Sequence, residues 1–185
     1  MVRRFVGSVG ILAGALLTGC ASAPVPASRD SRELVISYDD AHASSTMAFP
    51  SGTYESVLRV ELPEGEHPPL RLRFQAQSAG QVEITIYEST LLETPGEPLE
   101  KFSRELAAQD LSNGIDGRWV VEDLASMKPL KGVIWIGVHK TAGSPTIWTS
   151  NVVTGQAFIR DNDPHNPMGL LPTKRTPMLR LELAR

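Results

Sequence analysis

The segment Asp161–Pro167, with the sequence DNDPHNP, is the densest run of polar side chains that could bind an ion. Carboxylate and amide oxygens that alternate along a loop are ligands for Ca²⁺. Under this interpretation Asp161 and Asp163 bind calcium, and Asp39 and Asp40 supply further oxygens. The same residue types more often mark a turn between strands, and the full EF-hand pattern is absent. Both interpretations stay open.

Three tryptophans, Trp119, Trp135 and Trp148, offer rings on which a sugar can stack. Each lies beside Val or Ile in an apolar run, and burial in a core is the more common use of such a ring. Trp148 is the best candidate for ligand binding. Its neighbours on the same face of a strand are Ser150 and Val152, so that face is less apolar than those of the other two.

The four histidines are not part of any known catalytic or metal-binding motif. The sequence has no HExxH, GxSxG or CxxC pattern. We therefore expect a protein that is not an enzyme and has no cofactor apart from calcium. A hydrolase whose site combines His139 or His165 with Asp123 or Asp163 is the less favoured alternative.

Cys20 is the only cysteine in the chain and follows a short apolar stretch, Phe5–Leu17, which lies behind the basic residues Arg3 and Arg4. The stretch is too short for a permanent membrane span, so residues 1–19 are predicted to be a signal peptide. A single cysteine cannot form an internal disulfide. Attachment of a lipid to its sulfur would instead hold the protein at a membrane.

The junction Leu17-Thr18-Gly19-Cys20 resembles the lipobox of bacterial lipoproteins, in which the cysteine is acylated and becomes the first residue of the mature chain. The resemblance implies a lipid, palmitate included, on Cys20. Ala21 stands where an aspartate would favour the inner membrane in such lipoproteins. The expected location is therefore the outer membrane, on its periplasmic or its surface face.

Residues 20–33 are rich in Ala, Ser and Pro and predict a flexible tether, and residues 34–185 predict one folded domain. Without Arg3 and Arg4, 16 basic residues face 21 acidic ones, a net charge of −5. An acidic chain with no basic cluster is a poor partner for nucleic acid. The expected partners are the membrane, through Cys20, and an envelope protein or polysaccharide.

Apolar residues alternate with polar ones in short runs along the domain, as half-buried strands require. The most regular run is Leu70–Gln77, in which Phe74 belongs to the apolar set. Thr154-Gly155 predicts a tight hairpin between strands at Ile147–Val153 and Gln156–Arg160. The other expected strands are Leu34–Tyr38, Tyr54–Leu62, Val82–Tyr87, Lys101–Leu106, Trp119–Leu124, Val133–Val138 and Met178–Leu183. No run of three turns has helical periodicity, and Glu105–Leu111 predicts at most a short helix or turn. The expected fold is an all-β, jelly-roll-like antiparallel β-sandwich, with a closed barrel as the alternative.

Four short landmarks occur in order along the domain: Leu34–Asp40, Trp119–Leu124, Gly132–Val138 and Met178–Leu181. Their order resembles the "YDDG"-type jelly-roll accessory modules of secreted bacterial proteins, which are related in shape to cleaved-adhesin and carbohydrate-binding modules. Ala41 departs from the glycine of the opening motif. The resemblance implies a non-catalytic module that binds or positions another envelope component. A carbohydrate-binding module proper is the alternative.

Overall fold

The computed structural model describes residues 33–163 and 169–185. Cys20, the tether and His165 lie outside this part of the chain. Residues Arg32–Arg185 form one compact unit. In the described residues the one helical element is the 3₁₀ turn η1 (Ala108–Asp110), which lies within the segment that predicted a turn. No helix described there is long and apolar enough to cross a membrane.

Twelve strands build the described part of the domain. They are β1 (Glu33–Ser37), β2 (Ser45–Ala48), β3 (Tyr54–Glu61), β4 (Pro69–Phe74), β5 (Ala76–Ser89), β6 (Pro95–Leu106), β7 (Val120–Asp123), β8 (Val133–Ser150), β9 (Ala157–Asp161), β10 (Leu170–Pro172), β11 (Thr176–Pro177) and β12 (Leu179–Ala184).

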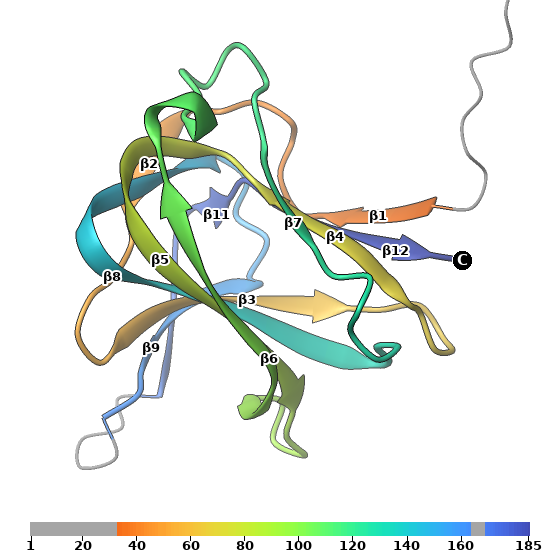
Figure 1. The fold of residues 1–185 in the computed structure, drawn as a ribbon. Coiled ribbons are helices and arrows are strands. Elements are labelled where there is room, and N and C mark those ends of the chain that lie inside the picture. Colours follow the sequence, from red (N-terminus) through yellow and green to blue (C-terminus); the bar gives the residue numbers. More distant parts are fainter. Residues whose placement is uncertain (1–32, 164–168) are drawn as a thin grey trace, which may run out of the picture. The chain divides into compact units, whose positions relative to one another are not determined.

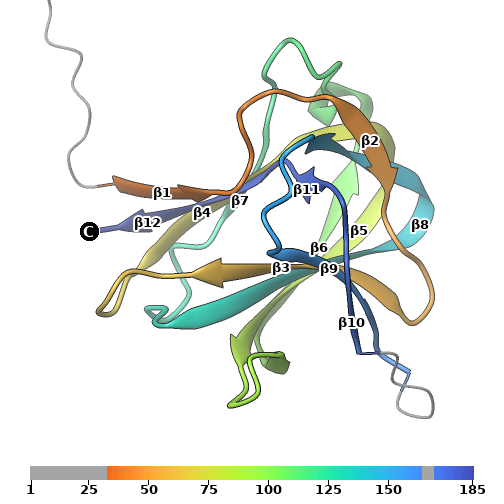
Figure 2. The same ribbon diagram turned by 180° about the vertical axis from the view of Figure 1, so that it is seen from behind.

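The strands form two antiparallel sheets that pack as a sandwich, as the alternation predicted (Figures 1 and 2). The smaller sheet has the order β1-β12-β4-β7. The larger has the order β10-β9-β3-β8-β5-β6, and β2 and β11 also pair with β8. Non-consecutive strands such as β3, β8 and β9 therefore lie side by side and bring distant parts of the sequence together.

Two long strands, β5 and β8, run alongside each other and curve from the larger sheet toward the end where β2 and β11 lie (Figure 1). The sequence run Val133–Val138 and the first four residues of Ile147–Val153, expected as separate strands, both belong to β8, and Asn151–Val153 lie beyond its end. Because β8 ends at Ser150 and pairs with β2 and β11, it does not pair with β9. The predicted hairpin at Thr154-Gly155 is therefore wrong: β9 crosses to lie between β3 and β10.

The most regular predicted strand is in fact two strands. The chain leaves the smaller sheet after Phe74 and enters the larger sheet at Ala76. Gln75, at the junction, is 3% exposed, and its backbone bonds to Met178 and Trp148. The backbone of the chain therefore changes its pairing partners at Gln75. The alternation of apolar and polar residues continues unbroken through this point, so the sequence does not reveal the change.

The core lies between the sheets and takes the apolar face of most strands. Leu72 and Phe74 are at most 1% exposed, which confirms their predicted inward face. The outer face of the larger sheet has a second, smaller apolar cluster of Val57, Tyr87 and Trp135, with Phe158 and Leu170 packed against it. Two of its residues, Tyr87 and Leu170, also belong to the polar site described next.

Candidate binding site at the end of the sandwich

A pocket of about 360 Å³ opens between the β5–β6 hairpin and the ends of β9 and β10. Its size is at the lower end of the range of small-molecule sites, which is roughly 300–1,000 Å³. Thr94 and Pro95 line one side, and Gly169 and Leu170 another. The polar lining comes from four consecutive residues of β9 and its continuation, Arg160, Asp161, Asn162 and Asp163.

Glu55 lies behind this pocket and is 1% exposed. It faces the outer side of the larger sheet, because its strand alternates and Leu58 and Val60 take the core side. The Tyr87 hydroxyl donates to the Glu55 carboxylate, 3.0 Å from each oxygen. Asn162 donates its amide N–H to Oε2 at 3.3 Å. Glu55 thus joins β3, β5 and the pocket wall.

Gly137 of β8 makes room for this carboxylate. A Cβ at position 137 would lie 2.0 Å from Glu55 Oε1. The φ of Gly137 is not in the left-handed region, so space and not backbone conformation requires the glycine. The glycine within the Gly132–Val138 landmark therefore has a local physical reason in this chain.

Burial sets the protonation behaviour of the Glu55–Tyr87 pair. Loss of water raises the pKa of Glu55, against the opposing effect of the hydrogen bonds from Asn162 and Tyr87 and the charge of Arg160. Burial, and then the Glu55 charge, raises the pKa of Tyr87 to about 12. The tyrosine hydroxyl therefore stays protonated and remains a donor.

The raised pKa of Glu55 predicts a pH-dependent stability. The stability that neutral Glu55 contributes to the folded protein is fully present below the ordinary pKa of 4.5. It is lost as the pH rises through the pKa of Glu55 in the folded state. Glu55→Gln removes this titration. The stability of the variant relative to wild type should rise with pH above 4.5, by at most about 1.4 kcal/mol per pH unit.

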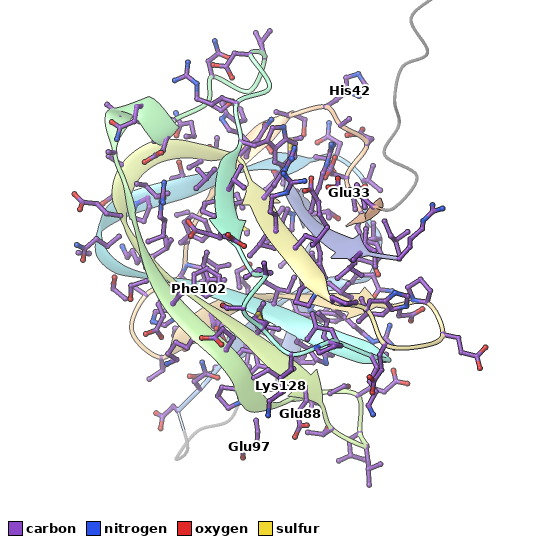
Figure 3. The ribbon with its side chains drawn as sticks, turned by 45° about the vertical axis from the view of Figure 1, so that its right-hand side comes forward. Glu33, His42, Glu88, Glu97, Phe102 and Lys128 are labelled. Atoms are coloured by element: carbon purple, nitrogen blue, oxygen red, sulfur yellow. The ribbon has the colours of Figure 1, made fainter. Side chains whose placement is uncertain are left out.

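Urea unfolding at several pH values between 4.5 and 7.5 measures this difference. The matched control is Glu97→Gln, at an exposed position on β6 near the hairpin end, where Glu88 of β5 also lies (Figure 3). A constant stability difference between Glu55→Gln and wild type across the pH range would contradict the prediction.

Arg160 is held from two sides. Its Nη1 lies 4.0 Å from Glu55 Oε2, and its guanidinium lies 5.0 Å from the centre of the Tyr87 ring. Nη1 is buried and forms no hydrogen bond within the described part of the chain. The Arg160 side chain is 25% exposed and lines the pocket. This geometry fixes a cationic group for binding.

The β5–β6 hairpin presents two leucines beside the pocket. Leu91 is 103% exposed and Leu92 is 86% exposed. The backbone that carries them is fixed: Thr90 N–H donates to Thr94 O at 2.9 Å, and the Leu92 N–H donates to Thr90 Oγ1 at 3.2 Å. Glu93 adopts the left-handed region with φ 54°, and its carboxylate pairs with Arg59 at 2.9 Å.

The two predicted calcium ligands both line the pocket. Asp161 is 8% exposed, and its Oδ1 accepts the backbone N–H of Asp163 at 3.0 Å, as in an Asx turn. The described residues contain no group of three or more His, Cys, Asp or Glu side chains arranged to hold a metal. Calcium binding at Asp161 and Asp163 stays a prediction. Asp39 and Asp40 accept backbone N–H groups of their own turn and do not line this pocket.

The tryptophans lie in three different settings. Trp135 is 1% exposed and packs against Phe158, with ring centres 5.7 Å apart. Trp148 is half-buried, and its indole N–H donates to the Ser112 carbonyl at 2.8 Å. A Cβ at Gly114 would lie 3.1 Å from its ring, so the loop 112–114 covers part of that ring. The exposed remainder is what a ligand of Trp148 would contact.

His139 and Asp123 do not form a shared site. His139 lies on the outer face of the larger sheet, with Nε2 3.6 Å from Glu83 Oε1. Asp123 is exposed at the end of β7 in the smaller sheet. The other acid of this alternative, Asp163, lines the pocket, and His165 lies outside the described residues.

Residues from three of the sequence landmarks meet at the smaller sheet. Arg180 donates to both oxygens of Asp39, at 2.6 and 3.2 Å, and its guanidinium lies 4.4 Å from the centre of the Trp119 ring. Ala41, where the motif usually has glycine, adopts a left-handed φ of 64°. The opening turn therefore has the glycine-like conformation although an alanine occupies it.

Comparisons with known proteins report little similarity. No protein-family model matches the chain, and no curated protein matches it. Among solved structures, one chain in the structure of infectious bursal disease virus Gx strain is 13% identical, with a TM-score of 0.23. The match covers 83% of this chain and 36% of that viral chain.

Sequence reasoning missed Glu55, Tyr87 and Arg160, which lie on three strands that are not consecutive in the sequence. Two signals pointed toward this end of the domain. One is Gly137 inside an apolar strand, a position that often marks close approach by another group. The other is Leu91-Leu92 within a turn, where apolar side chains have no core to enter.

Proposed function

We propose that this chain is a lipid-anchored lipoprotein of the outer membrane whose β-sandwich is a non-catalytic binding module for another envelope component. The observation that carries the proposal is the pocket in which Arg160 is held by the buried Glu55. Fixed polar groups beside apolar surface suit recognition of a ligand. The contacts among Asp39, Trp119 and Arg180 bring together residues from three of the landmarks on which the resemblance to the jelly-roll accessory modules rests.

The geometry favours binding over catalysis. A general acid or base must reach the proton that it transfers. Glu55 has the perturbed pKa that a catalytic group often has, but it is 1% exposed and both of its oxygens accept from Tyr87. It therefore acts by positioning Arg160 and Asn162, and a substrate in the pocket would not touch it.

Site-specific photocrosslinking in intact cells tests the pocket. A photoreactive residue at Leu170, in the pocket, should give an adduct with an envelope component. Ile115, 92% exposed in the loop 112–118, is the control position. The Arg160→Gln variant should lose the Leu170 adduct while the protein level stays unchanged. An adduct that is absent at Leu170, or that persists unchanged with Arg160→Gln, would contradict the proposal.

The lipid anchor predicts a second result. Cys20→Ala removes the sulfur that would carry the lipid, so labelling with radioactive palmitate should fall to background. The protein should move from the membrane fraction to the soluble fraction. Ser22→Ala, two residues further along, is the control and should change neither readout. Membrane association without incorporated fatty acid would overturn the anchor.

A further inference from the structure

We propose that the hairpin tip Leu91-Leu92 inserts into the bilayer and that the adjoining pocket binds the head group of a zwitterionic phospholipid with a primary ammonium. The inference rests on the proposed lipid anchor, and it names the ligand class of the proposed binding module. The hairpin and the ends of β9 and β10 lie at the same end of the domain in both views (Figures 1 and 2). Thr94 and Pro95 belong to the hairpin and also line the pocket.

The tip has the properties of an insertion element. Leu91 and Leu92 are 103% and 86% exposed, and hydrogen bonds between Thr90 and Thr94 close the turn that carries them. Two side chains are far too little for a stable protein interface, which needs roughly 800 Å² from each partner. They are sufficient for shallow burial in hydrocarbon when another anchor already holds the protein at the surface.

The chain beyond the described residues is long enough for this placement. Thirteen residues lead from Cys20 to Glu33. Such a segment spans at most about 43–47 Å. A domain of this length has a diameter of roughly 38 Å. A lipid on Cys20 therefore leaves the hairpin end free to turn toward the same bilayer.

The pocket offers both signs of charge. Arg160 presents a guanidinium to a phosphate, which it binds well as a fork of donors. Asp161 and Asp163 line the same pocket, and an ammonium bound there would lie beside carboxylates. The exposed carboxylates of Glu88 and Glu97 lie on the two strands of the hairpin and disfavour an anionic surface, whereas Glu93 is paired with Arg59. These groups together select a head group with a phosphate and a hydrogen-bonding ammonium.

Depth measurements on the full acylated protein test the inference. A new cysteine is the one free thiol when Cys20 is acylated, so an environment-sensitive dye can be attached at Leu91→Cys or, as control, at Ile115→Cys. The protein is reconstituted on phosphatidylcholine vesicles alone, or with phosphatidylethanolamine or phosphatidylglycerol as half of the lipid. Brominated acyl chains then quench dyes that enter the hydrocarbon.

The dye at position 91 should shift to the blue and be quenched, and the dye at position 115 should not. The ratio of inserted to free tips should be about tenfold higher with phosphatidylethanolamine than with phosphatidylcholine, because a quaternary ammonium cannot donate a hydrogen bond to Asp161. It should be lowest with phosphatidylglycerol. Arg160→Gln should weaken insertion on both zwitterionic vesicles, because both lipids carry the phosphate, and Asp161→Asn should remove the preference for phosphatidylethanolamine.

Two outcomes overturn the inference. A dye at position 91 that stays in water on every vesicle excludes insertion, and insertion without a head-group preference excludes the pocket as the head-group site. Failure of the anchor is seen separately, because a protein without incorporated fatty acid does not float with the vesicles. The Leu170 crosslink shows separately whether the binding module fails. If the pocket binds an envelope protein or polysaccharide and not lipid, the Leu170 adduct still forms; if the pocket binds nothing, no adduct forms.

Discussion

Gly137→Ala should lower the free energy of unfolding by about 1–3 kcal/mol, the usual cost of overpacking. The added Cβ would lie 2.0 Å from Glu55 Oε1, and neither strand β3 nor β8 can shift without breaking its pairing with neighbours on both sides. The carboxylate must therefore leave its position, and the Tyr87 hydroxyl loses its acceptor. Urea unfolding with the tryptophan emission as signal measures the loss.

A double-mutant cycle shows whether Glu55 is the cause. Glu55→Ala removes the group that the new methyl would meet, so the double variant Glu55→Ala, Gly137→Ala should be more stable than the sum of the single effects by about 1–3 kcal/mol. Additive effects would mean that Gly137 is required for a reason other than this carboxylate. Loss of stability within about 0.5 kcal/mol for Gly137→Ala alone would contradict the arrangement of the site.

The strands and their faces were predictable because alternation is a local property. In β4 the inward set Leu72 and Phe74 and the outward pair Arg71 and Arg73 follow directly from a period of two. The break at Gln75 was not predictable, because it depends on which sheet the next residues join. The same holds for β8 and β9, which a short turn sequence suggested as a hairpin.

The site was not predictable because it depends on long-range register. Glu55 and Tyr87 are 32 residues apart, and Glu55 and Asn162 are 107 apart. They meet because β3 lies between β8 and β9 in the sheet. Alternation places Glu55 on the face opposite the core, where a glutamate is usually solvated. Its burial follows from the cover that Tyr87, Arg160 and Asn162 provide, which no single segment of sequence encodes.

Phe74→Ala tests the part of the fold that the sequence did predict. The side chain is 1% exposed at the end of β4, where it packs between the two sheets, so truncation should cost about 3–5 kcal/mol of unfolding free energy. Val121→Ala is the matched control. Val121 pairs with the neighbouring Arg73 but is 43% exposed on the outer face, so its truncation should cost within about 0.5 kcal/mol. The comparison therefore separates burial from strand membership, since both residues lie in paired strands of the same sheet. Equal losses for the two variants would show that the faces of the smaller sheet are assigned wrongly, and with them the core that holds the two sheets together.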